Sequence, residues 1–163
     1  MTAKRVLGLA GMVFGLVFVV PSVASAASSP GVRVIGENEQ VLAIFKTAKC
    51  TKGKHYFHAE AFSTDKAYEL DAGIRDFSGF HPYEVALGST NPHILFESRQ
   101  AGSPAYSNEF EPPYPVPGAG QIRFSPNGKR VGIGFGPAMW SDDGSSAVVL
   151  AGGLECRYPK KRR

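Results

Sequence analysis

A strict alternation near the end of the chain restricts its fold more than any other feature of the sequence. Between Val131 and Gly136, apolar residues and glycines take turns without interruption. A period of two belongs to β-strands, because successive side chains of a strand point to opposite faces. One face would then be apolar and the other bare, with Val131, Ile133 and Phe135 on the first and Gly132, Gly134 and Gly136 on the second.

Short segments of strand-like composition fill most of the remaining chain. They lie at Val32–Ile35, Gln40–Cys50, His55–Phe62, Tyr68–Ile74, Tyr83–Leu87, His93–Glu97, Ile122–Phe124, Lys129–Gly136 and Ala147–Cys156. No segment keeps apolar residues at helical spacing between capping residues. The sequence therefore predicts an all-β fold, an antiparallel β-sandwich or flattened barrel of eight or nine short strands. Gln40–Cys50 is apolar on both faces, which predicts a central strand.

The first 26 residues are typical of a cleavable export signal. Lys4 and Arg5 precede the apolar run Val6–Val20, and Ala24-Ser25-Ala26 supplies the small residues of a cleavage site. The run is short for a membrane span, and the sequence after it offers no second candidate. We therefore expect a secreted, extracellular protein with a flexible leader at 27–31, one β domain at 32–157 and a tail at 158–163.

The chain has two cysteines. Exported proteins usually keep such a pair oxidised, so we predict a disulfide between Cys50 and Cys156. The bond would join the last strand to the strand that ends at Cys50. No Cys-x-x-Cys pair or other metal-binding spacing is present, and we expect neither a metal nor a cofactor.

The excess of basic over acidic residues comes from the two ends of the chain. Between residues 27 and 159, acidic residues slightly outnumber basic ones. This balance argues against a nucleic-acid-binding face and makes a nucleic acid an unexpected partner. The last four residues, Lys160, Lys161, Arg162 and Arg163, could attach the protein electrostatically to an anionic surface, or could simply solubilise a disordered end.

The segment 101–119 is rich in proline and carries exposed-looking aromatic residues. We predict an irregular loop here, because prolines remove ladder donors, and long loops of this kind are often functional. The candidate ligand-binding residues are the aromatics of this loop, the bare strand face and the single tryptophan: Tyr106, Phe110, Tyr114, Gly132, Gly134, Gly136 and Trp140. The alternative, which we favour, is that an aromatic ring covers the glycines as ordinary packing.

Sequence motifs of known enzyme classes are missing, so we assign no catalytic residue. His55 and His58 fall on opposite faces of a strand, and a site that combines His58, Glu60 and a distant acid is an open alternative. The sequence around Asp142-Asp143 lacks the ligand spacing of an EF-hand calcium loop, and we interpret it as an acidic turn. The interpretation that we favour is a secreted, non-catalytic module that binds an extracellular or cell-surface ligand: a glycan, wall polymer, lipid or protein. The alternatives are a secreted hydrolase and a structural or inhibitory secreted protein.

Overall fold

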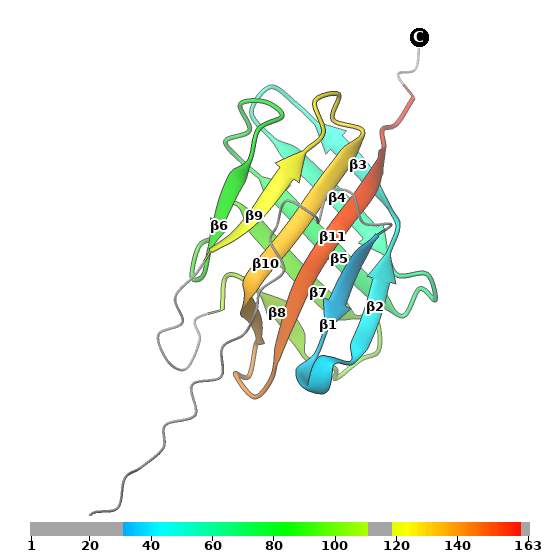
Figure 1. Cartoon of the computed structure of the whole chain (residues 1–163), viewed down its shortest axis with the longest axis vertical. Helices are drawn as coiled ribbons and strands as arrows, with labels where there is room; N and C mark the ends of the chain where they lie inside the picture. The colour runs from blue at the N-terminus through cyan, green and yellow to red at the C-terminus, as the bar shows by residue number, and fades with distance from the viewer. Residues whose placement is uncertain (1–30, 111–118, 161–163) are drawn as a thin grey trace, which may run out of the picture.

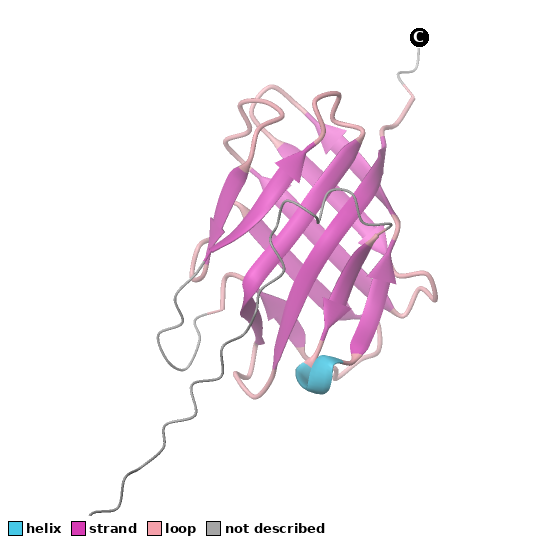
Figure 2. Cartoon of the chain, viewed as in Figure 1, coloured by secondary structure: helices cyan, strands magenta, loops and turns pink. Residues whose placement is uncertain are grey.

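The computed structural model describes residues 31–110 and 119–160. The predicted export signal, the greater part of the leader, Tyr114 and the three terminal cations Lys161, Arg162 and Arg163 lie outside these ranges. Within them the fold is all-β, and its one helical element is the short 3-10 turn η2 at Glu37–Glu39 (Figure 2). No helix in these ranges is long and apolar enough to cross a membrane.

In residues 31–110 and 119–160, eleven strands form one continuous sheet. They are β1 Val32–Ile35, β2 Val41–Phe45, β3 Thr47–Lys52, β4 Phe57–Phe62, β5 Tyr68–Ile74, β6 Tyr83–Ala86, β7 His93–Ser98, β8 Ala105–Ser107, β9 Ala119–Phe124, β10 Arg130–Ser141 and β11 Ala147–Arg157. The strand order is β2-β1-β11-β3-β4-β5-β7-β8-β10-β9-β6, and β10 also pairs with β11. This extra pairing closes the sheet on itself.

The result is a flattened barrel of two layers (Figure 1). The front layer holds β6, β9, β10, β11, β1 and β2, and the back layer holds β3, β4, β5, β7 and β8. The layers are joined where β11 passes from β1 to β3 and where β10 passes from β9 to β8. The predicted all-β, antiparallel sandwich or barrel is confirmed, with one exception in the ladder: β11 and β3 pair in parallel.

The predicted strand count of eight or nine is too low, partly because Gln40–Cys50 is not one strand. The strand is interrupted at Lys46. As a result, β2 lies at the edge of the front layer and β3 lies in the back layer. Only β3 is central, between β11 and β4. The apolar residues on both parities are explained by this corner, since the buried face changes parity where the strand changes layer.

The predicted irregular loop 101–119 also contains regular structure. Ala105–Ser107 forms β8, which pairs with both β7 and β10. In the same way β10 does not end at Gly136 but runs to Ser141. Its register with β11 shifts between Phe135 and Met139, and this bulge lets the strand tolerate Pro137, which lacks an N–H donor.

The inner faces of the two layers form one apolar core. Val131, Ile133 and Phe135 are fully buried, which confirms that the apolar face of the alternating strand faces inward. Large rings such as Phe45, Phe57 and Phe96 fill the centre, and Phe45 meets Phe96 edge to face with ring centroids 6.2 Å apart.

The predicted disulfide is confirmed. Cys50 and Cys156 are bonded, with Cα atoms 5.3 Å apart and a sequence separation of 106. The bond lies where β11 meets β3, and it therefore fixes one of the two junctions between the layers.

Candidate functional site

The most distinctive place on the surface is the fork where β11 changes neighbours. Residues 149–151 of β11 pair with β1, whereas residues 155–157 pair with β3. Gly152 lies between these two pairings with φ +142°, and a Cβ atom there would overlap the backbone of Gly31 and Val32. Only glycine allows β1 to start so close to β11. Beyond Gly152, β11 no longer pairs with β1, and a cleft lies beside it.

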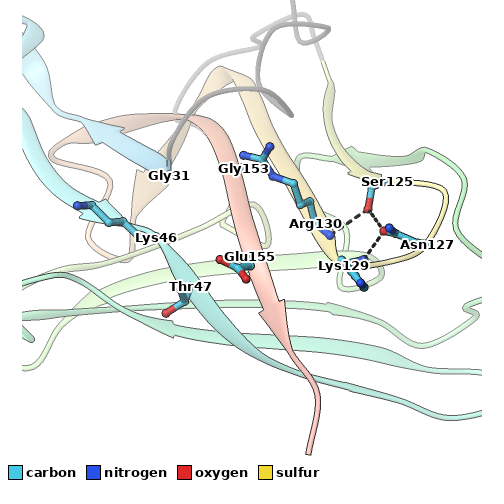
Figure 3. Close-up of a pocket in the computed structure, with 9 residues that line it drawn as sticks. All are labelled: Gly31, Lys46, Thr47, Ser125, Asn127, Lys129, Arg130, Gly153 and Glu155. Atoms are coloured by element: carbon cyan, nitrogen blue, oxygen red, sulfur yellow. Dashed lines mark hydrogen bonds between the residues drawn. The ribbon is translucent and has the colours of Figure 1, made fainter.

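The cleft has a volume of about 720 Å³ (Figure 3). It is lined by Gly31, Lys46, Thr47, Ser125, Asn127, Lys129, Arg130, Gly153 and Glu155. In Figure 3, Lys46 and Thr47 lie on one side of Glu155, and Arg130, Ser125, Asn127 and Lys129 lie on the other. None of the lining residues that the structure describes has an apolar side chain beyond the methyl group of Thr47, so the cleft suits a polar ligand.

The right wall of the cleft is a rigid turn between β9 and β10. Ser125 Oγ donates to Asn127 Oδ1 (2.9 Å), and it accepts from the backbone N–H of Arg130 (3.0 Å). Asn127 Oδ1 also accepts from the backbone N–H of Lys129 (3.0 Å). Gly128 takes φ +65°, the left-handed conformation that the glycine of a bulged type I turn adopts. These hydrogen bonds hold Lys129 and Arg130 at the rim of the cleft through their backbone N–H groups.

The opposite wall is the corner between β2 and β3. The backbone N–H of Glu155 donates to the Lys46 carbonyl (3.0 Å), which fixes the corner beside β11. Lys46, Lys129, Arg130 and Glu155 are all exposed. In the described part of the chain no carboxylate forms an ion pair with Lys46 or Lys129. Within the described lining, three cations against one carboxylate make the cleft electropositive.

The same outer face carries two more arginines, placed by the register of the front layer. Gly132 of β10 lies opposite Gly153 of β11 and Arg123 of β9. Ala151 of β11 lies opposite Arg33 of β1. Arg123 donates from Nε to Gln121 Oε1 (2.7 Å), which orients its guanidinium group. Gly153 is thus both a wall of the cleft and the cross-strand partner of Gly132.

The sequence-based candidates are not gathered in one place. Gly132 and Gly134 lie on the outer face beside the cleft, and both are buried. Trp140 pairs with Ser107 and Ala147 at the other end of β10. The candidates therefore divide between two regions, one at each end of the strand, and Gly136 lies on β10 between them.

The aromatic candidates of the proline-rich segment face different surroundings. Tyr106 packs its ring on Phe96, with centroids 5.7 Å apart, and its hydroxyl meets Ser146 Oγ at 3.1 Å. Phe110 is half-buried at the end of the described range, and Tyr114 lies beyond it. Tyr106 therefore contributes mainly to packing at the junction between β8 and β10.

Rings do cover glycines in this fold, but at positions that the alternation did not indicate. A Cβ atom on Gly120 of β9 would overlap the ring of Phe135, and one on Gly73 of β5 would overlap the ring of His93. These are cross-strand aromatic contacts of the expected kind. They show why glycine is required at both positions.

A second polar cluster lies on the outer face of the back layer. Asp71 of β5 accepts from His58 Nε2 (2.5 Å) and from His93 Nε2 (2.8 Å), so one carboxylate joins the two histidines. The sequence indicated His58 as a candidate but missed Asp71 and His93. Only strand register reveals them, since His58 and His93 both lie opposite Gly73. The surrounding face is acidic, and burial followed by the carboxylates of Glu60 and Glu97 raises the pKa of Glu69.

Asp71 predicts a pH dependence of stability. Burial of its carboxylate opposes ionisation, but the hydrogen bonds from His93 and His58 outweigh it and lower the pKa below 3.8. A carboxyl group whose pKa is lower in the folded state than in the unfolded state stabilises the protein at pH values above its unfolded-state pKa. This contribution is lost as the pH falls through the folded-state pKa. Asp71→Asn should therefore cost about 1–2 kcal/mol at pH 7 and progressively less below about pH 4. Urea unfolding between pH 7 and pH 2.5 measures this, and a cost independent of pH would contradict it.

A third cluster combines a hydroxyl with an imidazole in the turn after β5. Ser78 Oγ lies 2.8 Å from His81 Nε2, and His81 Nδ1 lies 3.0 Å from the Pro82 carbonyl. Since a carbonyl only accepts, Nδ1 carries the proton and Ser78 donates to Nε2. The backbone N–H groups of Ser78 and Gly79, however, both donate to the Tyr83 hydroxyl. They are therefore not directed at a position where an oxyanion would form.

Among the described residues, no group of three or more histidine, cysteine, aspartate or glutamate side chains is arranged to hold a metal ion. Comparison of the chain with protein-family models, with characterised proteins and with solved structures finds no match. The function must therefore be argued from the geometry of these sites.

Proposed function

We propose that this protein is an exported, non-catalytic binding module that holds an anionic group of an extracellular or cell-surface ligand in the basic cleft. The observation that carries the proposal is the composition of the cleft. Among its described lining residues, Lys46, Lys129 and Arg130 face one carboxylate, Glu155, and none of them has a large apolar side chain. Such a site attracts anions and offers little to a lipid tail or a neutral apolar ligand.

Polar groups in the walls add directional hydrogen bonding to this attraction. Thr47 and Asn127 line the cleft beside the cations, and hydroxyl and amide groups can bond the oxygens of a carboxylate, sulfate or phosphate. The two walls belong to different layers of the barrel, and the disulfide fixes the junction between them. The cleft is therefore preorganised, which lowers the entropy lost on binding.

The start of the C-terminal tail also supports binding of an anionic group in the cleft. The Tyr158 hydroxyl donates to the Gly128 carbonyl (2.8 Å), which holds the start of the tail against the turn that forms one wall of the cleft. Burial raises the pKa of Tyr158, so this donor keeps its proton at neutral pH. Lys160 follows two residues later, within about 7 Å of chain, and adds positive charge near the site.

Hydrolysis has weaker support than binding. The Ser78–His81 pair is exposed and its neighbouring N–H groups are engaged by Tyr83. The His58–Asp71–His93 cluster lies on an acidic face and not in the cleft. Neither arrangement brings a nucleophile, a base and oxyanion donors together.

Removing charge from the cleft tests the proposal. Lys46→Gln combined with Lys129→Gln should weaken binding of polygalacturonate about ten-fold at moderate salt, because two screened ion pairs contribute together about 1–2 kcal/mol. Isothermal titration calorimetry against polygalacturonate, with neutral dextran as the reference polymer, measures the effect.

The matched control is Lys66→Gln combined with Arg75→Gln, which removes the same charge from two exposed positions that do not line the cleft. This variant should bind like the wild type. Equal binding of dextran and polygalacturonate, or no binding of any anionic polymer, would overturn the proposed function.

A further inference from the structure

We infer that the ligand is an extended anionic polysaccharide that crosses the front layer from the cleft to Arg33 and Arg123, and not a single small anion. This inference rests on the proposed function and adds the size and chemical class of the ligand. Its basis is the register of four neighbouring strands, β9, β10, β11 and β1, which places Arg33, Arg123 and Arg130 on one outer face, beside the cleft that Lys46 and Lys129 line.

The spacing of these cations exceeds the reach of one charged group. Arg33 and Arg123 are separated by β11 and β10 and are offset by two residues along the strands. Three strand spacings of about 4.8 Å and this offset place their Cα atoms about 16 Å apart. Arg123 and Arg130 differ by register as well, since Arg123 lies opposite Gly132 and Arg130 lies opposite Glu155. One carboxylate can therefore pair with the cleft cations or with the outer arginines, but a chain of carboxylates can pair with both.

The strand positions between Arg33 and Arg123 carry almost no side chains. The positions between Arg33 and Arg123 in these two rows are Ala151, Gly134, Gly132 and Gly153, which project at most a methyl group. Gly132 and Gly134 are themselves buried, so the contacts offered here come from the arginine side chains that flank them.

Charge on this face is strongly one-sided. Glu155 and, at the edge, Glu84 of β6 are the carboxylates that the register places in the same rows. No described carboxylate forms an ion pair with Arg33 or Arg123. The described residues of these rows include no aromatic side chain, so the stacking platforms that single-stranded nucleic acids use are missing here. Complementarity thus favours a polyanion recognised by its charges and hydroxyls, as an acidic polysaccharide would be.

Oligomer length separates this inference from the proposed function. Binding of digalacturonate and of decagalacturonate should be measured by calorimetry for the wild type, for Lys46→Gln/Lys129→Gln and for Arg33→Gln/Arg123→Gln. The outer pair should matter only for the decamer, with a loss of about ten-fold, and should leave dimer affinity within two-fold. The cleft pair should weaken both ligands. The slope of log Kd against log salt concentration should be smaller for the outer variant with the decamer.

Each outcome decides between the two ideas. If the decamer binds and the outer variant retains wild-type affinity, the extended path is wrong while the basic cleft stands. If neither oligomer binds, the proposed function itself fails. If a single-stranded oligonucleotide of equal charge binds as tightly as the decamer, with the same dependence on Arg33 and Arg123, the assignment to a polysaccharide is wrong. Lys66→Gln/Arg75→Gln again serves as the charge-matched control, and thermal unfolding checks that all variants are folded.

Discussion

Replacement of both Cys50 and Cys156 by alanine should lower the free energy of unfolding by about 3–5 kcal/mol. The bond joins residues 106 apart, and closing a loop of that length is worth nearly 5 kcal/mol in the chain-entropy model. The local effect should be large as well, because β11 and β3 share only three registered pairs at this junction. Urea unfolding under oxidising conditions measures the change.

The reductant provides the control for this experiment. Wild-type protein treated with dithiothreitol should unfold like the double alanine variant, and the variant should not respond to dithiothreitol at all. The variant should also lose affinity for anionic polymers, because Lys46 and Thr47 lie on the strand corner that the bond holds beside β11. A loss of stability below about 1 kcal/mol would show that the barrel closes without the disulfide.

Asn108→Asp should be the most damaging conservative substitution in the fold, at about 3–5 kcal/mol near neutral pH. The Asn108 side chain is fully buried. Its Nδ2 donates to the carbonyls of Ala86 (3.0 Å), Ser89 (2.8 Å) and Pro92 (3.2 Å), and its Oδ1 accepts from the Ile94 N–H (2.6 Å). Aspartate keeps the shape but directs a negative oxygen at three carbonyls, which leaves a buried charge with the Ile94 N–H as its one donor among these contacts.

The pH dependence identifies this mechanism. Burial and the carbonyls must raise the folded-state pKa of the new carboxyl above its unfolded value. The destabilisation is then largest above the folded-state pKa and shrinks as pH falls and the carboxyl becomes protonated. Asn108→Ala, which removes the hydrogen bonds without adding a charge, should cost about 2–4 kcal/mol at every pH. Urea unfolding from pH 8 to pH 4 measures the free energy of unfolding of both variants. If it depends on pH in the same way for both, the explanation is wrong.

The distribution of charge could not be derived from the sequence. Counting acidic and basic residues gave a nearly balanced domain and argued against a basic face. In the folded chain, Arg33, Arg123 and Arg130 lie on the outer face of the front layer, and Glu60, Glu69, Asp71 and Glu97 lie together on the back layer. These groups are far apart in sequence and are brought together by strand register, which a residue count does not contain.

The candidate site was only partly accessible to sequence reasoning for the same reason. The alternation pointed to Gly132 and Gly134, which border the cleft through Gly153. Lys46 and Lys129 carried no local signal, because each is an ordinary lysine at the end of a strand. They become a site only because β11 exchanges one neighbour for another at Gly152, and no pattern along the chain announces that exchange.

Local physics fixed the parts of this protein that depend on near neighbours. Period-two alternation determined the all-β class and the inward face of β10, and two cysteines determined the disulfide. Tertiary structure alone decided that the chain turns at Lys46 into a different layer, that Ala105–Ser107 joins the sheet, and that β11 borders β1 and β3 in succession. Pairing between distant strands is selected by how the whole core packs, so the basic cleft exists only once the barrel has closed.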